Sequence, residues 1–146
     1  MIHGKGKYFA GAILLLGGFA GTMYVTNAAP REPRVEASSK PYIVKVHAQW
    51  CPVCMMTRGV WNEIHSFYAG RVSLVVFDVT SGDTVAASRT EARRLGLGAF
   101  FDDHSDLTGT IYILDGRTKA LIGRLHGDRD FAHYRTAIDE ALRATH

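Results

Sequence analysis

The pattern of apolar and polar positions sets an uncharged N-terminal segment apart from the rest of the chain. Residues 8–30 carry no charge, residues 8–25 are mostly apolar, and Lys5 and Lys7 precede them. A positive start followed by an apolar run is typical of an export signal, and its length is close to the roughly 20 residues of a membrane-spanning helix. We therefore predict an apolar helix, with residues 1–29 acting as a signal peptide or membrane anchor that leaves the rest outside the cytoplasm.

The residues that follow divide into a linker and one folded domain. Residues 30–40 contain Pro33, alternating charges and the pair Ser38-Ser39, without a repeating apolar pattern. Residues 41–146 have periodic apolar positions and enough length for one compact core. The sequence therefore predicts a linker at 30–40 and a single domain at 41–146.

The first half of this domain alternates between strand and helix. Residues 42–47 are rich in β-branched side chains and predict a strand. A helix should begin at Pro52, continue with apolar residues at helical spacing and end at Gly70. Residues 72–79 are nearly all apolar, as in a strand whose two faces are both covered. Strands joined through a helix are expected to run parallel.

The second half predicts another helix, two antiparallel strands and a closing helix. The elements are a helix capped by Asp83 or Thr84 and ended by Gly96, an irregular stretch at 98–108, a strand at 110–114, a tight turn at Asp115-Gly116, a strand at 121–125 and a helix at 130–144. The complete order is β-α-β-α-β-β-α. It predicts an α/β fold in which a mixed four-stranded sheet is flanked by helices.

Charge and cysteine content exclude several classes of function. The formal net charge is +3, but from Arg31 onward 15 basic residues are balanced by 14 acidic ones. Without a basic stripe that alternates with aromatic side chains, nucleic acid is not an expected partner. The chain has 2 cysteines, too few for a fold that depends on disulfide cross-links, and its histidines have no recognisable metal-site spacing. We predict neither a metal nor an organic cofactor.

The motif most directly tied to chemistry is Trp50-Cys51-Pro52-Val53-Cys54. The predicted strand ends just before it and the predicted helix begins within it, so Cys51 should lie near a helix N-terminus. Unpaired N–H groups there favour a thiolate, the form of cysteine that attacks a disulfide. Cys54 follows one turn later on the same side, where it can resolve a mixed disulfide formed at Cys51.

A Trp-Cys-x-x-Cys motif between a strand and a helix resembles the thioredoxin superfamily. The resemblance spans residues 40–142, because the Asp115-Gly116 hairpin, the Gly127 turn and the closing helix are similar to the C-terminal half of that fold. It implies a thioredoxin-like fold and a thiol–disulfide oxidoreductase in which Cys51 attacks and Cys54 resolves. With its export segment, the chain is similar to periplasmic bacterial members, anchored in the inner membrane or secreted. The implied partners are proteins that carry thiols or disulfides and a membrane redox partner.

One departure from the family lies opposite the cysteines. Family members usually place a cis-proline just before the third strand, where this chain has Thr108-Gly109-Thr110. A cis bond before a residue other than proline costs about 3 kcal/mol, so we expect a trans bond. The resemblance then implies a substrate groove of altered geometry, formed by Trp50, Pro52, Thr108 and Gly109.

Lys45 is a second departure. It lies six residues before Cys51, where thioredoxin has a buried aspartate. Burial would lower the pKa of Lys45, and its charge would favour a thiolate at Cys51 or Cys54. The alternative is a surface lysine whose stem lies along apolar neighbours.

Two alternatives to a redox enzyme stay open. Soft sulfur ligands favour copper(I), so Cys51 and Cys54 with Met55 or Met56 also fit a copper(I)-handling module. Against it, one of two adjacent methionines on a helix is expected to face the core. A redox-inert binding domain is the other alternative, because the family's proline is missing. The direction of exchange is not determined by the sequence, but the layout is similar to that of periplasmic members that reduce other proteins, so we favour a reductase.

Overall fold

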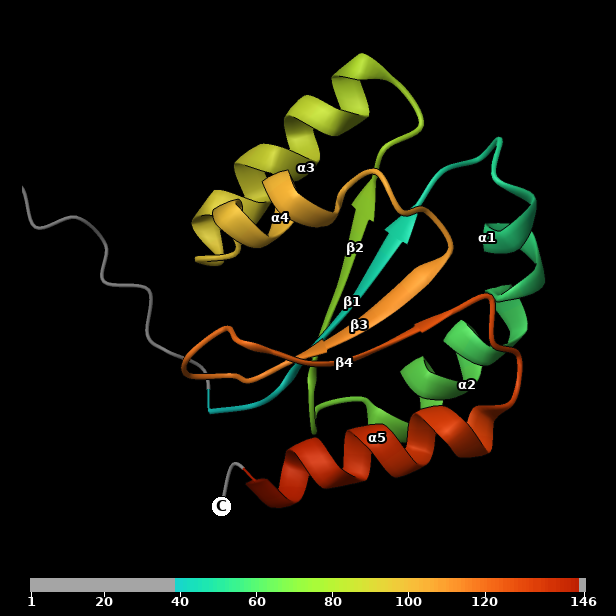
Figure 1. Cartoon of the computed structure of the whole chain (residues 1–146), viewed down its shortest axis with the longest axis vertical. Coiled ribbons are helices and arrows are strands. Elements are labelled where there is room, and N and C mark those ends of the chain that lie inside the picture. The colour runs from blue at the N-terminus through green and yellow to red at the C-terminus, as the bar shows by residue number, and fades with distance from the viewer. Residues whose placement is uncertain (1–38, 145–146) are drawn as a thin grey trace, which may run out of the picture. The chain divides into compact units, whose positions relative to one another are not determined.

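The computed structural model describes residues 39–144 (Figure 1). The predicted apolar helix, signal peptide or anchor at residues 1–29 lies outside the described residues, as does most of the linker predicted at 30–40. Within the described part, no helix has both the length and the apolar character needed to cross a membrane. What we expect of residues 1–38 therefore stays a prediction.

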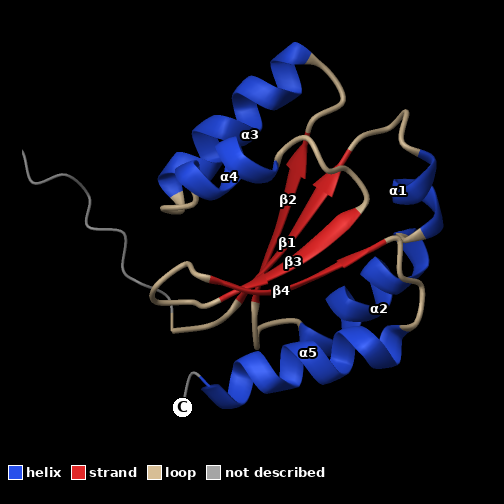
Figure 2. Ribbon diagram, viewed as in Figure 1, coloured by secondary structure: helices blue, strands red, loops and turns tan. Residues whose placement is uncertain are grey.

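The described residues form a four-stranded sheet with helices on both faces (Figure 2). In chain order the elements are β1 (Tyr42–His47), α1 (Pro52–Met56), α2 (Arg58–Tyr68), β2 (Ser73–Asp78), α3 (Gly82–Arg94), α4 (Gly98–His104), β3 (Thr110–Leu114), β4 (Leu121–His126) and α5 (Phe131–Ala144). The strand order is β2-β1-β3-β4, with β1 and β2 parallel and β3 antiparallel to both of its neighbours. The predicted α/β fold with a mixed four-stranded sheet is confirmed.

Helices lie on both faces of the sheet (Figure 1), and an apolar layer packs between the sheet and the helices on each face. On one face, α2 and α5 pack over Ile43, Ile111 and Ile113. On the other face, α3 and α4 pack over Val44 and Tyr112. Because side chains alternate along a strand, the central strand β1 supplies both layers. The same alternation places Lys45 and His47 on the face of β1 that Ile43 occupies.

The helix predicted from Pro52 to Gly70 is two helices, α1 and α2, that meet at Thr57. The buried Thr57 hydroxyl donates to the carbonyl oxygens of Val53 and Cys54, at 3.0 and 3.3 Å. A threonine side chain that bonds to the preceding turn competes with regular helix geometry. The prediction of one uninterrupted helix was therefore wrong at this point, and the break lies directly after the cysteine turn.

The stretch predicted as irregular at 98–108 contains α4. Leu97 and Phe101 are fully buried against the α3 side of the sheet, whereas Asp102 and Asp103 are exposed. A helix of seven residues spans only two turns, too few for an apolar period to be recognised. The packing of Phe101, rather than a pattern along the chain, accounts for this helix.

The N-cap of α3 is Ser81, not the predicted Asp83 or Thr84. The Ser81 hydroxyl accepts the backbone N–H of Thr84 at 3.3 Å, and the Thr84 hydroxyl oxygen accepts the backbone N–H of Ser81 at 2.9 Å. This reciprocal pair satisfies two backbone donors that a helix start leaves open. Gly96 follows the helix end as predicted, with a φ of +72°.

Two predictions about the outer strands also needed correction. β2 is an edge strand, and Val76 is 46% exposed, so its two faces are not both covered. The turn after β3 is wider than a two-residue turn: the N–H of Asp115 bonds to the carbonyl of Ala120 at 2.9 Å. The residue with left-handed backbone is Lys119, at φ 63°, rather than Gly116. The Asp115 carboxylate stabilises this loop by accepting backbone N–H groups within it.

Candidate active site

Cys51 lies in the loop between β1 and α1, at the N-cap position of α1. Its backbone N–H donates to the carbonyl oxygen of Ala48 at 3.2 Å, and its Sγ accepts the backbone N–H of Cys54 at 3.2 Å. Pro52 occupies the first helical position, where a missing N–H costs nothing. The predicted arrangement of strand, cysteine and helix start is present, and it brings the two cysteines within one turn of each other.

Several hydrogen-bond donors converge on the sulfur of Cys51. Burial by itself raises the pKa of Cys51, but the S–H of Cys54, the hydroxyl of Thr108 and the backbone N–H groups of Cys54 and Val53 together lower this pKa below its usual value. Since α1 has only five residues, its dipole contributes less than these direct donors. Cys51 is therefore the cysteine of the pair that ionises first.

Cys54 has the opposite environment. It is 1% exposed, against 4% for Cys51, and its Sγ lies 3.9 Å from the carbonyl oxygen of Val46. Burial and the neighbouring Cys51 sulfur raise the pKa of Cys54, although the charge of Lys45 acts to lower it. The two cysteines thus have unequal roles: Cys51 holds the negative charge, and Cys54 keeps a proton that it donates to Cys51.

Gly109 lies against the residue between the two cysteines. A Cβ on Gly109 would stand 2.5 Å from Cγ1 of Val53, and the backbone φ of Gly109 is +77°. The N–H of Gly109 donates to the carbonyl of Val46 at 2.9 Å. Proline has no N–H and cannot adopt this φ, so this backbone conformation requires glycine rather than proline. As expected, this peptide bond is trans, since no cis bond occurs among residues 39–144.

The surface around the cysteine pair is apolar and exposed. Trp50, Met55 and Met56 are 64%, 64% and 51% exposed. The indole Nε1 of Trp50 donates to the carbonyl of Thr80 at 3.1 Å, which holds the ring beside the cysteine loop. The expectation that one methionine faces the core was wrong, because Cys54 takes the inward position of α1. The role of Trp50, Pro52, Thr108 and Gly109 as a substrate groove stays a prediction.

Lys45 is buried, at 4% exposure, so the surface alternative does not hold. Its Nζ lies 5.6 Å from the centre of the Trp61 ring. Burial lowers the pKa of Lys45, the cysteines raise it, and Arg58 lowers it further. The charge of Lys45 acts mainly on Cys54 rather than on Cys51.

Sequence reasoning missed His47, which shares a face of β1 with Lys45. Its Nδ1 is buried and has no hydrogen-bond partner among the described residues. Burial and then Lys45 lower the pKa of His47, and Asp78 opposes them. The only signal in the sequence was the spacing of two residues on a strand, which places Lys45 and His47 on the same side.

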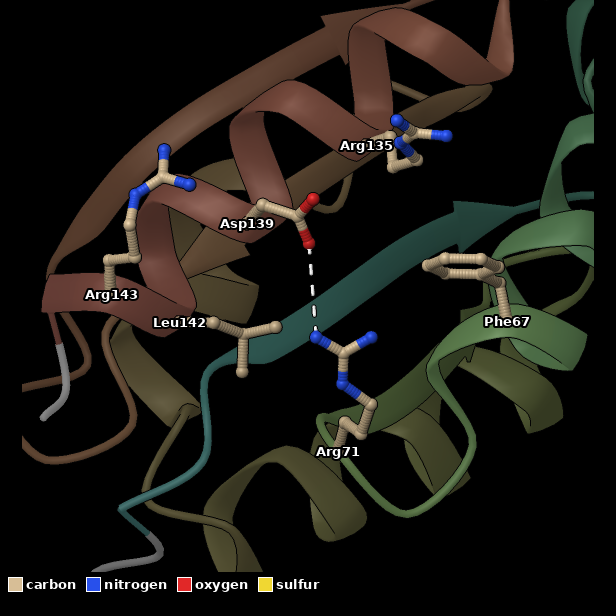
Figure 3. Close-up of a pocket in the computed structure, with 6 residues that line it drawn as sticks. All are labelled: Phe67, Arg71, Arg135, Asp139, Leu142 and Arg143. Atoms are coloured by element: carbon tan, nitrogen blue, oxygen red, sulfur yellow. Dashed lines mark ion pairs between the residues drawn. The ribbon is translucent and has the colours of Figure 1, made fainter.

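A separate cavity of about 520 Å³ lies between α2 and α5 (Figure 3). It is lined by Phe67, Arg71, Arg135, Asp139, Leu142 and Arg143. Arg71 and Asp139 form an ion pair at 4.0 Å across it. None of its lining residues is a nucleophile, and residues 39–144 contain no group of three or more His, Cys, Asp or Glu side chains suited to a metal ion. Cys51 and Cys54, both free cysteines, are the candidate reactive groups.

Comparison with known proteins agrees with this geometry. Residues 22–92 match the thioredoxin family model, whereas no curated protein matches the chain. A solved structure described as a thioredoxin-like protein in the oxidized form has 16% identity, covers 73% of this chain and 80% of its own, and has a TM-score of 0.50.

Two further solved structures are similar at lower TM-scores. Trxlp from Edwardsiella tarda EIB202 has 22% identity, coverage of 70% of this chain and 84% of its own, and a TM-score of 0.45. A thiol:disulfide interchange protein of the thioredoxin family from Chlorobium tepidum TLS has 21% identity, coverage of 71% and 81%, and a TM-score of 0.47.

The family match includes β1, the cysteine pair and most of α3, and the fold extends the likeness to the antiparallel half of the sheet. Together they support a thiol–disulfide redox function in general terms. The chain thus has a thioredoxin-like fold, and its residues 22–92 match the thioredoxin family model.

Proposed function

We propose that this chain catalyses thiol–disulfide exchange on other proteins through Cys51 and Cys54. The observation that carries the proposal is the unequal pair: hydrogen-bond donors lower the pKa of Cys51, while burial raises the pKa of Cys54. A two-step exchange needs a nucleophile that is already ionised and a second thiol beside it that can resolve the mixed disulfide.

In the reducing direction, the Cys51 thiolate attacks one sulfur of a substrate disulfide. A mixed disulfide forms at Cys51, and the other substrate sulfur leaves as a thiolate and takes a proton. Cys54 then gives up its proton and attacks the Sγ of Cys51, so that a Cys51–Cys54 disulfide forms and the second substrate thiol leaves. The substrate gains two electrons, and a dithiol protein of the membrane restores the reduced pair.

The exposed apolar surface supports a polypeptide as the substrate. Trp50, Met55 and Met56 present apolar side chains around Cys51, which is itself only 4% exposed. Large apolar side chains at the surface favour contacts with other proteins, and flexible methionines adapt to partners of different shape. A thiol- or disulfide-bearing segment laid across this surface would bring its sulfur to Cys51.

We propose that this domain acts outside the cytoplasm, in a periplasm. The chain would be either anchored in the inner membrane or released after cleavage of its N-terminal segment. Support comes from the sequence alone, where Lys5 and Lys7 precede the uncharged residues 8–30. Fractionation of the full chain, with sequencing of the N-terminus of the mature protein, distinguishes an anchor from a cleaved signal. Recovery in the cytoplasm would overturn this placement.

The test of the exchange function is reduction of a disulfide-bonded protein by the reduced full chain. Wild type should reduce it, Cys51→Ser should not, and Cys54→Ser should accumulate a mixed disulfide that Cys51→Ser cannot form. No reduction by wild type would contradict the proposal. Absence of exchange together with stoichiometric copper(I) binding by the reduced chain would favour the metal-handling alternative, and absence of both would favour a redox-inert binding domain.

A further inference from the structure

The cavity between α2 and α5 carries an excess of positive charge (Figure 3). Its lining has three arginines against a single carboxylate, that of Asp139, so its formal charge is +2. The apolar side chains of Phe67 and Leu142 complete the lining. Its volume of about 520 Å³ falls within the range of small-molecule sites. The cavity is therefore suited to a ligand with an anionic head and an apolar body.

Arg71, which follows α2, is positioned by aromatic rings and extends towards Asp139 (Figure 3). Its guanidinium carbon lies 5.1 Å from the centre of the Tyr68 ring and 5.9 Å from that of the Phe67 ring. Its ion pair with Asp139 measures 4.0 Å, which is longer than a hydrogen bond. Asp139 instead accepts a hydrogen bond from the hydroxyl of Tyr68 at 2.8 Å. The contact with Asp139 therefore leaves the N–H donors of the guanidinium group open to a ligand.

Arg135 and Arg143 extend the positive charge along α5. Each is four residues from Asp139, a spacing that places all three on the same side of the helix. No ion pair among residues 39–144 includes Arg135 or Arg143, and both are exposed. One guanidinium fork is enough for a carboxylate, whereas a phosphate has three terminal oxygens that several guanidinium groups can share. Three arginines around one cavity therefore favour a phosphate.

The cavity and Cys51 belong to opposite ends of the sheet. Arg71 lies two residues before Ser73, the first residue of β2, and the N–H of Ser73 donates to the carbonyl of Pro41 at 2.8 Å. The cavity thus borders the N-terminal ends of β1 and β2, whereas Cys51 follows the C-terminal end of β1. A strand of six residues, such as β1, is about 20 Å long. The described chain begins at residue 39, at the end that borders the cavity, and the apolar run predicted as an anchor precedes this point.

We propose that this cavity binds the phosphate group of an amphiphilic ligand. The donors are the guanidinium groups of Arg71, Arg135 and Arg143, and the apolar part of the ligand packs on Phe67 and Leu142. The same chemistry has two sources, the headgroup of an acidic phospholipid and a soluble organic phosphate. The position of the cavity favours the lipid, because a domain held there would direct its cysteines away from the bilayer. The inference is independent of the exchange function, since it involves no residue of the cysteine loop.

The experiment measures protection of arginines from phenylglyoxal, which modifies accessible guanidinium groups, in the full chain held in a neutral detergent. Hexyl phosphate should protect Arg71, Arg135 and Arg143, each followed separately by mass spectrometry. Arg124, an exposed residue of β4, is the matched control and should keep its rate of modification. Inorganic phosphate, which lacks the apolar part, and hexanoate, which has a carboxylate head, should each need concentrations about tenfold higher. Stronger protection by hexanoate than by hexyl phosphate would overturn the assignment to phosphate.

Reconstitution of the full chain into vesicles distinguishes the two sources of phosphate. One preparation contains phosphatidylcholine alone, and the other contains phosphatidylcholine with phosphatidylglycerol. Greater protection of the three arginines in the vesicles with phosphatidylglycerol, with Arg124 unchanged, supports the lipid headgroup. Protection by hexyl phosphate without any effect of phosphatidylglycerol supports the soluble phosphate. Absence of protection by both ligands would overturn the proposal.

Variants test the site by its charge. Arg135→Gln should raise the concentration of hexyl phosphate that half-protects Arg71 by about tenfold, because one charged donor is lost. Asp139→Asn should lower that concentration, since asparagine still accepts the Tyr68 hydroxyl but does not repel the phosphate. Arg124→Gln should leave it unchanged.

The same half-protecting concentration in wild type, Arg135→Gln and Asp139→Asn would overturn the proposal. If Arg135→Gln does not fold, Arg143→Gln on the last turn of α5 provides the same comparison. Disulfide exchange by Arg135→Gln should equal that of wild type, so a failure of this site and a failure of the exchange function are distinguishable.

Discussion

The side chain of Val53 occupies the space that any side chain on Gly109 would need. A Cβ on Gly109 would meet Cγ1 of Val53 at 2.5 Å and its Cβ at 2.8 Å. Val53 stands between the two cysteines, and the backbone N–H of Val53 is one of the donors to Cys51. The glycine therefore determines how closely the Thr108 segment approaches the cysteine turn.

Gly109→Ala should lower the free energy of unfolding and also displace the turn that carries Cys51 and Cys54. A left-handed backbone at a residue other than glycine costs about 1–2 kcal/mol, and overpacking adds about 1–3 kcal/mol. Denaturant unfolding measures the sum. In the Val53→Ala background the clash with Cγ1 is removed, while the contact with Cβ and the backbone cost persist. Gly109→Ala should therefore destabilise less in that background, and equal destabilisation in both backgrounds would contradict the contact.

Gly109→Pro should be more harmful than Gly109→Ala, although proline is the residue that the family usually has here. Proline cannot reach a φ of +77° and removes the N–H that bonds to the carbonyl of Val46 at 2.9 Å. Thermal unfolding of the two variants provides the comparison. A Gly109→Pro chain as stable as wild type would show that the segment rearranges around proline.

Thr108→Val should raise the pKa of Cys51. The Thr108 hydroxyl donates to the thiolate and so lowers this pKa, and valine keeps the shape without the donor. Alkylation of Cys51 in Cys54→Ser, followed against pH, should shift to higher pH by up to about one unit. Thr90→Val on the exposed side of α3 is the control, and an unshifted profile in Thr108→Val would rule out the hydroxyl as a donor.

The same ionisation affects stability with a definite sign. The pKa of Cys51 is lower in the folded chain than its usual value, so the thiolate stabilises the reduced fold at pH above that usual value. This contribution is lost as the pH falls through the folded pKa. Thr108→Val should therefore lose part of it, and the unfolding free energies of Thr108→Val and wild type should converge towards acid pH.

Trp50→Ala should weaken exchange with proteins more than exchange with small disulfides. The indole ring is 64% exposed beside the cysteine loop, where a bound polypeptide would cover it. Loss of an aromatic contact at the centre of an interface costs upwards of about 1 kcal/mol. The kcat/KM for a protein disulfide should fall about fivefold or more. The rate at which Cys51 attacks a small chromophoric disulfide, dithiobis(nitrobenzoate), should be unchanged. Ile122→Ala, an equally apolar exposed position on β4, is the control.

The sequence was sufficient to predict the helices and strands whose apolar or β-branched pattern extends over several turns or residues. The β-branched run of β1, the apolar spacing of α2 and α5, and the position of the cysteine pair at a helix start all agree with the structure. These features depend on neighbours along the chain, which a pattern reports directly.

What the sequence did not reveal depends on contacts between distant residues. The hydroxyl of Thr108 reaches Cys51 from the loop before β3, and the buried Nδ1 of His47 depends on what packs over β1. Phe101 makes α4 part of the core, although seven residues are too few to show a period. Packing across the sheet determines all three, so no local pattern could have predicted them.

We expect Cys51 and Cys54 to form a reversible redox pair that acts as a reductant. Equilibration of the full chain with glutathione buffers of graded potential measures it directly. A single two-electron transition between dithiol and disulfide should occur towards the reducing end of the range from about −270 to −120 mV that exchange proteins span. A transition near the upper end would reverse the direction, and the absence of any transition would contradict the redox function.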